Sequence, residues 1–215
     1  MTERLKIIFD NIPACSVFAD IGCDHGYVSK AMLVSGKAKK VVASDVSAKC
    51  LQKAESVLKE NIDRGNAKCV VSNGFEKIEF CDCALIAGMG GEEITDIMLK
   101  AKFLPETLVL QPMKNCDKVR LCAVKAGYKI EKDFVFKSGG KFYDLMVLVI
   151  GEDSLTEEEI EFGRTNLLKR PSAFKERLLV QIEKLKKYSA QDGLDEDAKA
   201  QMLRKMEKLS RYVEI

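Results

Sequence analysis

The 215-residue sequence lacks the features that mark membrane and secreted proteins. No run reaches the roughly 18 apolar residues that a membrane-spanning helix needs. The first ten residues, MTERLKIIFD, carry acidic side chains and no uninterrupted apolar core, so they do not resemble a signal peptide. We therefore expect a cytoplasmic protein that does not enter a membrane.

Patterns that bind metal ions are also scarce. The chain has a single histidine, and its eight cysteines mostly lie in apolar or helical patterns, where a free thiol behaves as a small hydrophobic group. It is not a small secreted domain of the kind that disulfide bonds hold together. Only Cys81 and Cys83 are close in sequence, and neither a second pair nor a nearby histidine completes a zinc-ligand set. We expect free thiols and no metal site.

What the sequence does contain is a regular alternation of strand and helix. Hydrophobic content of 47% with 32% charged residues is typical of a globular chain. The alternation predicts a parallel sheet covered on both faces, and the turn KSGGK adds a final antiparallel hairpin. This outline resembles the class I methyltransferase fold more than a pure dinucleotide-binding fold. Strands are expected at 17–21, 40–45, 68–72, 82–87, 106–111, 129–136 and 143–150, and helices at 27–36, 48–64, 91–102 and 115–127.

From Thr156 onward the sequence is typical of helices, with breaks at KRPSAF and AQDGLDED. Pro171 suits a helix start, and Gly193 suits a break. Two apolar stripes at helical spacing predict an antiparallel, coiled-coil-like helix pair. The stripes are Phe174, Leu178, Ile182 and Leu185, then Met202, Met206, Leu209 and Val213. We expect a Rossmann-like domain over residues 1–152 and a helical domain over 153–215.

The start of this helical region is locally basic. Eight Lys or Arg residues lie between positions 164 and 187, against only Glu176 and Glu183. One interpretation is an ordinary solvated helix face, and the other is a surface that contacts phosphates. The sequence leaves both open.

The stretch ADIGCDHGYV, residues 19–28, is the strongest candidate for a ligand site. It follows a buried strand and precedes a helix, as ligand-binding turns do in this class of fold. Its acids Asp20 and Asp24 flank Gly22, and a phosphate would be repelled there. A cationic or zwitterionic ligand fits better, and S-adenosylmethionine has an ammonium group, a sulfonium and no phosphate. The alternative is a structural turn in which Asp20 caps the helix.

Other strand ends carry matching side chains. Asp45 ends the second strand, where an acid can accept hydrogen bonds from both ribose hydroxyls of an adenosine, although SDVSAK also suits a helix N-cap. Asn73 is placed to bond an adenine edge. The fourth strand ends in IAGMGG, whose glycines leave the backbone bare beside the crevice. Gln111, in LQPM, is expected to face the site and orient a substrate base, or else simply to end a strand before Pro112.

Taken in order, FADIGCDHGYV, LIAGMGG, LVLQPM and YDLMVLVIG resemble the bacterial tRNA (adenine-22, N1) methyltransferase family. The resemblance spans residues 1 to about 150 and extends more loosely through the helical tail. It implies a Rossmann-like methyltransferase domain with a helical domain, and methylation by S-adenosylmethionine of N1 of adenine 22 in the D arm of tRNA. Met113 departs from the asparagine that some relatives have after QP.

The resemblance also implies site residues. Asp24 and Tyr27, of the DH-x-Y motif, match the residues assigned to catalysis or base placement. The basic residues of the tail, with Gln111 and Pro112, are expected to contact tRNA. The cofactor residues implied are Asp20, Gly22, Cys23, Asp24, His25, Gly26, Asp45, Val46, Asn73, Gly74, Ala87, Gly88 and Met89. The expected tRNA contacts are Gln111, Pro112, Arg164, Lys169, Arg170, Lys175 and Arg177.

N1 of adenine keeps a lone pair at neutral pH, so it can displace the sulfonium methyl group directly. Asp24 is expected to stabilise the resulting positive charge or to accept the N6 proton, while Tyr27 stacks on the base. His25 is an alternative base, although a single histidine in a tight turn more often serves structure. The alternative functions are a methyltransferase for a small molecule or protein, and a noncatalytic module that binds S-adenosylmethionine or RNA. We expect a monomer.

Overall fold

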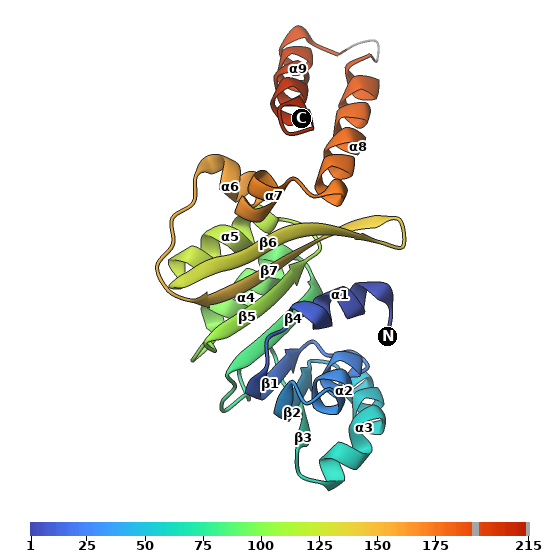
Figure 1. Cartoon of the computed structure of the whole chain (residues 1–215), viewed down its shortest axis with the longest axis vertical. Helices are drawn as coiled ribbons and strands as arrows, with labels where there is room; N and C mark the ends of the chain where they lie inside the picture. Colours follow the sequence, from blue (N-terminus) through green and yellow to red (C-terminus); the bar gives the residue numbers. More distant parts are fainter. Residues whose placement is uncertain (191–193, 214–215) are drawn as a thin grey trace.

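A seven-stranded sheet in the order β3-β2-β1-β4-β5-β7-β6 forms the centre of the protein. The structure is a computed structural model that describes residues 1–190 and 194–213 (Figure 1). The break expected at Gly193 lies outside the described residues. The strands are β1 (Cys15–Ile21), β2 (Ala38–Asp45), β3 (Ala67–Val71), β4 (Cys83–Met89), β5 (Thr107–Pro112), β6 (Tyr128–Ser138) and β7 (Lys141–Ile150).

Strand pairing confirms the predicted Rossmann-like methyltransferase fold. Strands β1 to β5 pair in parallel, and β7 pairs antiparallel with both β5 and β6. Gly139 and Gly140 form the turn of the hairpin, both at positive φ, where glycine avoids a steric penalty. The strand order reverses between β1 and β4, and ligands bind at such a reversal in open α/β sheets.

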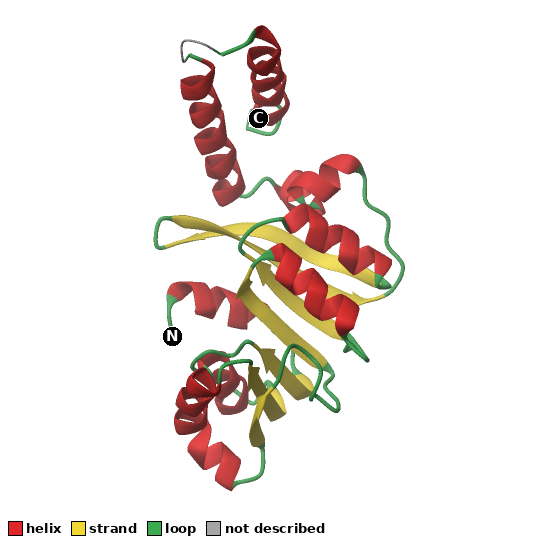
Figure 2. Cartoon of the chain, turned by 180° about the vertical axis from the view of Figure 1, so that it is seen from behind, coloured by secondary structure: helices red, strands yellow, loops and turns green. Residues whose placement is uncertain are grey.

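Helices cover both faces of the sheet. Helices α1 (Glu3–Asn11), α2 (Tyr27–Val34) and α3 (Ala48–Asp63) pack on one face, where Ile8 and Met32 are fully buried. Helices α4 (Gly91–Lys100) and α5 (Cys116–Lys125) cover the other face, as Figure 2 shows from behind. Helix α1 was not predicted, although Thr2 caps it and its apolar residues have helical spacing.

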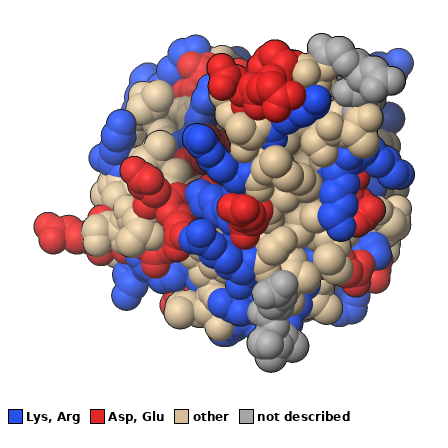
Figure 3. Space-filling model, turned by 90° about the horizontal axis from the view of Figure 1, so that it is seen from above, with Lys and Arg blue, Asp and Glu red and all other residues tan. Residues whose placement is uncertain are grey.

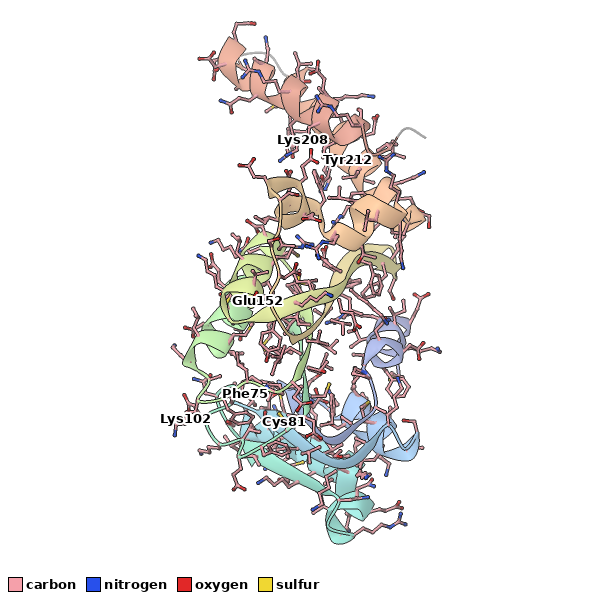
Figure 4. The ribbon with its side chains drawn as sticks, turned by 60° about the vertical axis from the view of Figure 1, so that its left-hand side comes forward. Phe75, Cys81, Lys102, Glu152, Lys208 and Tyr212 are labelled. Atoms are coloured by element: carbon pink, nitrogen blue, oxygen red, sulfur yellow. The ribbon has the colours of Figure 1, made fainter. Side chains whose placement is uncertain are left out.

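The tail is helical, as predicted. It contains α6 (Glu157–Phe162), α7 (Arg164–Lys169), α8 (Ser172–Ser189) and α9 (Glu196–Ser210). Pro171 lies at the N-cap of α8, and the two predicted stripes meet in a core that includes Phe174, Leu178 and Leu209. Near the end of α9, Lys208 and Tyr212 lie against α6, where Tyr212 packs on Phe162 with ring centroids 5.1 Å apart (Figure 4).

The helix pair shares its core with the β6–β7 hairpin. Val135 of β6 is buried in the same cluster as Phe174, and Phe142 of β7 packs against it. The tail is therefore attached to the sheet by apolar packing as well as by the chain.

All eight cysteines are free thiols. Across the part of the chain that the structure describes, no helix has both the length and the apolar character to cross a membrane.

Candidate functional site

A cavity of about 530 Å³ opens at the carboxyl ends of β1, β2 and β4, beside the reversal of strand order. Its volume falls within the usual range for small-molecule sites. The walls come from the loops after β1, β2, β3 and β4, together with the starts of α1 and α4. Of the predicted cofactor residues, Gly26 does not line the cavity and faces Ala54 of α3 instead. Those that line it are Asp20, Gly22, Cys23, Asp24, His25, Asp45, Val46, Asn73, Gly74, Ala87, Gly88 and Met89.

The turn after β1 is held by backbone hydrogen bonds. The amides of Gly22 and Cys23 both donate to the carbonyl of Ser44, at 2.8 and 2.9 Å. Gly22 and Gly26 have φ of +73° and +70°, and Asp24 has a left-handed φ of +50°. A Cβ on Gly22 would come within 2.1 Å of the Met89 side chain. The glycines are thus needed for the turn and for close approach to the cavity wall.

Asp20 is a buried carboxylate at the end of β1, only 4% exposed. Its Oδ2 accepts a hydrogen bond of 2.7 Å from the Ser29 hydroxyl. Burial raises the pKa of Asp20 to about 6, with a further contribution from Asp45, while the Ser29 bond opposes the rise. A cationic group bound in the cavity would stabilise the ionised form of Asp20.

Asp45 links the first two loops of the site. Its Oδ2 accepts from the Asp24 amide at 3.2 Å, and its Oδ1 accepts from the Ser47 amide at 2.8 Å. The N-cap of α3 is Ser47, whose hydroxyl accepts from Cys50. The sequence left open whether Asp45 is a cap or a ligand-binding acid. The structure gives the cap to Ser47 and places the half-buried Asp45 in the cavity wall.

Asp24, His25 and Tyr27 form one connected group. His25 Nδ1 lies 2.7 Å from Asp24 Oδ2, and its Nε2 lies 3.1 Å from Lys53 Nζ. An ammonium group only donates, so Nε2 accepts and Nδ1 carries the proton that bonds Asp24. The rings of His25 and Tyr27 are parallel, with centroids 5.7 Å apart. Both ring nitrogens of His25 are thus engaged, one with Asp24 and the other with Lys53.

The glycines at the junction of β4 and α4 have two roles. Gly88 lines the cavity at φ +80°, and a Cβ there would lie 2.9 Å from Arg4 Nη2. Gly91 instead packs against backbone, since a Cβ would lie 2.5 Å from the Asn115 carbonyl. A Cβ on Gly90 would lie 3.3 Å from Lys114 Cε, and neither glycine lines the cavity, so the expectation that both leave bare backbone at the crevice is corrected. After β3, Asn73 lines the cavity and donates to Glu76.

Gln111 does not face the site as expected. It is fully buried, and its Oε1 accepts hydrogen bonds from the guanidinium of Arg4. Its Nε2 donates to the Pro112 carbonyl at 3.0 Å. Arg4 lies between Gln111 and the cavity and lines the cavity itself. Gln111 thus orients Arg4, and neither Gln111 nor Pro112 is available for direct contact with a base.

Helices α1 and α4 contribute lining residues that the sequence reasoning missed. From α1 and its cap come Thr2, Arg4 and Leu5, and from α4 come Glu93 and Asp96. Thr2 before an amphipathic segment is an N-cap signal that would have revealed α1. No local pattern indicates that α1 turns back over the strand ends, because that depends on packing of Ile8 and Ile12 against the sheet.

The predicted tRNA-contacting residues of the tail lie apart from the cavity and differ in their surroundings. Arg164 is held by Asp153 and Glu159, at 2.9 and 2.7 Å, and Arg177 by Asp144 at 2.6 Å. Asp153 and Glu159 thus engage the Arg164 guanidinium, and Asp144 engages that of Arg177 through Nη1, so both of these expected phosphate contacts form ion pairs within the protein. Arg170 lies over the Tyr212 ring, at 5.9 Å from its centroid.

Lys169 is exposed and Lys175 is half-buried. Seen from above in Figure 3, basic side chains are interspersed with acidic ones over this end of the molecule.

The cavity can bind a ligand that presents a positive centre to Asp20 and hydroxyl groups to Asp45. Its bare backbone at Gly22 and Gly88 permits a flat ligand to approach closely. Within residues 1–190 and 194–213, no cluster of three or more His, Cys, Asp or Glu side chains is arranged to hold a metal ion.

Comparison with known proteins identifies the family to which the chain belongs. The family described as "Methyltransferase domain" matches residues 1–146, which is more than half of the chain. The chain belongs to this methyltransferase family. A Mycoplasma pneumoniae protein, a candidate tRNA methyltransferase, is 30% identical to this methyltransferase over 155 residues, covering 68% of this chain and 70% of the relative.

Two further relatives carry more specific names. The methyltransferase is 26% identical over 189 residues to the tRNA (adenine(22)-N(1))-methyltransferase of Bacillus subtilis, covering 86% of this chain and 79% of that protein. The structure of Mycoplasma capricolum TrmK, solved with S-adenosyl-homocysteine, has a TM-score of 0.87 at 24% identity, covering 99% of this chain and 97% of the other. The resemblance drawn from the motifs is confirmed by these matches.

Proposed function

We propose that this methyltransferase transfers a methyl group from S-adenosylmethionine to N1 of adenine 22 in the D arm of tRNA. The observation that carries the proposal is the group Asp20, Asp45 and Gly88 around one cavity, which suits a cationic nucleoside without phosphate. The Bacillus subtilis relative has this activity in its name, and the Mycoplasma capricolum structure holds the demethylated cofactor product. Cytoplasmic location and a monomeric state belong to the same proposal.

The residues around the cavity fit S-adenosylmethionine part by part. Asp45 would accept from the ribose hydroxyls, and Asn73, which follows β3 in the cavity wall, would bind the adenine edge. The amino acid end of the cofactor has an ammonium group and a carboxylate. Asp20 supplies negative charge for the first, and Arg4 is a guanidinium in the cavity wall for the second.

In the reaction, S-adenosylmethionine supplies an electrophilic methyl group on sulfur. The protein holds the adenine so that its N1 lone pair forms the new bond to carbon while the carbon–sulfur bond breaks and its electron pair stays on sulfur. Asp24, oriented by His25, stabilises the positive charge on the adenine ring and can take the N6 proton. Tyr27 is 49% exposed at the cavity mouth and offers a face for the unstacked base.

We assign residues 1–152 to the methyltransferase domain and 153–215 to a tRNA-contacting helical domain. Lys169 and Lys175 are retained as candidate phosphate contacts, together with Arg170, the C-cap residue of α7. Arg164 and Arg177 are given structural roles instead, because Arg164 is paired with Asp153 and Arg177 Nη1 with Asp144. RNA binding through lysines predicts an affinity that falls steeply with salt.

The proposal is tested with unmodified tRNA transcripts and isotopically labelled S-adenosylmethionine. After incubation, nuclease digestion and mass spectrometry locate the methylated nucleoside. We expect N1-methyladenosine at position 22 and no product from a transcript with guanine at that position. Transfer to a protein or small molecule but not to tRNA would refute the substrate, and binding of a nicotinamide dinucleotide in preference to S-adenosylmethionine would refute the cofactor.

A further inference from the structure

The β6–β7 hairpin extends beyond the end of the sheet at which the cavity opens, that is, beyond the carboxyl ends of the parallel strands. Pairing of β7 with β5 ends at Leu110 and Met146, whereas pairing between β6 and β7 continues to Ser138 and Lys141. We call residues 134–145 the hairpin overhang. In Figure 1 it projects beyond the other strands, with α1 on one side and α8 on the other.

The two faces of the overhang contact different parts of the protein. On one face, Tyr143 lies beside Arg4 of the cavity wall, whose Cζ is 5.1 Å from the ring centroid. On the opposite face, Phe142 packs with the core of the helical tail. Because successive side chains of a strand alternate in direction, β7 contacts the cavity wall and the tail through neighbouring residues.

Asp144 follows Tyr143 directly and binds the tail by an ion pair. Its Oδ2 lies 2.6 Å from Nη1 of Arg177 on α8, with side chains 9% and 19% exposed. Arg120 of α5 lies 3.6 Å from Asp144 Oδ1 and is paired with Asp133 of β6 at 2.6 Å. Two arginines and two aspartates thus balance their charges at the junction.

Arg120 extends the same junction to α6, because its Nη1 donates to the carbonyls of Ile160 and Glu161.

The link between Asp144 and Arg177 depends on direction as well as on charge. Asp144 Oδ1 and Arg177 Nε are buried without a hydrogen-bond partner among the described residues, so the link depends on the single bond from Nη1 to Oδ2. Apolar contacts such as those of Phe142 and Phe174 oppose separation of the tail from the hairpin. They oppose sliding of one on the other only weakly, because the hydrophobic effect has no direction. A buried ion pair contributes little net stability but can select one arrangement.

We propose that Asp144 and Arg177 are positioning residues, which hold α8 and the RNA-contacting tail in one orientation relative to the cavity so that the target adenine reaches the methyl donor. The inference rests on the proposed function. Misplacement of a substrate by about 1 Å can lower a rate by about 100-fold. Loss of the pair should therefore reduce turnover at saturating tRNA more than it reduces tRNA affinity.

The test uses the full-length double variant Asp144→Asn with Arg177→Gln, which removes both charges and leaves no buried charge unpaired. The matched control is Lys68→Gln with Glu79→Gln, which removes an exposed ion pair that lies outside both the tail and the cavity lining. For each protein we measure the Kd for S-adenosylmethionine, the Kd for tRNA at several salt concentrations, and kcat. Hydrogen exchange of α8 and of the overhang gives a readout that needs no RNA.

In the double variant we expect kcat to fall at least tenfold, both Kd values to stay within about threefold, and exchange to accelerate at the start of α8. The control should match the wild type. An unchanged kcat in the folded variant overturns the proposal. A weaker tRNA affinity with a smaller salt dependence and normal kcat also overturns it, since Arg177 would then be a phosphate contact.

Two further measurements apply if the double variant does not fold or if the wild-type protein is inactive on tRNA. If the double variant does not fold, Arg177→Lys keeps the charge but replaces the fixed Nη1 donor by a rotatable ammonium group on a flexible side chain; a kcat below one third of wild type supports positioning, and a higher value overturns it. If wild-type protein fails to methylate tRNA, the proposed function fails, while hydrogen exchange still reports whether the pair orders α8.

Discussion

Replacing Asp20 by Asn should stabilise the protein at neutral pH when no ligand is bound. Burial raises the pKa of Asp20 to about 6, from an ordinary value of 3.8. Between these two values the folded state binds more protons than the unfolded state, so stability falls as the pH rises from about 4 to 6. The neutral amide of Asn removes this penalty, and the Ser29 hydroxyl can donate to its oxygen as it does to Asp20.

The size of the effect follows from the shift. A difference of about two pKa units corresponds to about 3 kcal/mol of unfolding free energy once the pH exceeds 6. At pH 7.5 the Asp20→Asn variant should therefore be more stable than wild type by up to about 3 kcal/mol. At pH 4 the two proteins should differ little, because Asp20 is protonated in the folded state there.

Denaturant unfolding of the two proteins at pH 4, 5, 6 and 7.5, without ligand, measures this difference. Binding of S-adenosylmethionine provides the functional counterpart, since an ionised Asp20 attracts the ammonium group. Wild-type affinity should rise between pH 5.5 and 7.5 more than the variant's does. Equal stability of variant and wild type across the pH range would show that Asp20 is not a strained carboxylate and would refute the electrostatic reasoning.

Three further predictions concern the same site. Asp45→Ala should weaken S-adenosylmethionine binding at least about 30-fold in calorimetry, because hydrogen bonds to a charged acceptor contribute about 1.5–3 kcal/mol each, and should leave tRNA affinity unchanged; unaltered cofactor affinity would contradict the ribose assignment. Asp24→Asn, which tolerates the left-handed backbone, should lower kcat about 100-fold while tRNA still binds; a fully active variant would remove Asp24 from the mechanism. Gly26→Ala should lower the free energy of unfolding by about 1–3 kcal/mol, because φ is +70° and the new Cβ would lie 3.0 Å from Ala54 Cβ. Gly36 has φ +73° and open space around it, so Gly36→Ala measures the cost of the left-handed backbone alone. An equal loss of unfolding free energy in the two variants would show that the contact with Ala54 adds nothing.

The local sequence pattern predicted most of the fold, because each buried strand is a short run of apolar residues. The strand expected at 82–87 is β4, Cys83–Met89, and the hairpin turn lies at the two glycines of KSGGK. The pairing of acids with glycines at the strand ends also located the cavity residues, since carboxyl ends of parallel strands converge. Helix α1 was not predicted because it precedes the first strand, where the alternation of strand and helix begins.

Long-range partners account for the contacts that the sequence reasoning did not foresee. Gln111 lies next to the end of β5, yet its side chain is turned to Arg4, which is 107 positions away along the chain. Arg177 lies in a basic stretch, but its partner Asp144 comes from β7. Charge composition counts residues along one segment and contains no information about carboxylates brought to it by folding.

The sequence by itself determined the sheet, the helical tail and the chemical character of the ligand, because strand periodicity, glycine turns and acids at strand ends are local properties. Only the tertiary structure decided that α1 covers the cavity, that Arg4 enters its wall and that Arg177 serves a junction. These depend on which surfaces meet when apolar faces are buried, and burial joins residues far apart in the chain.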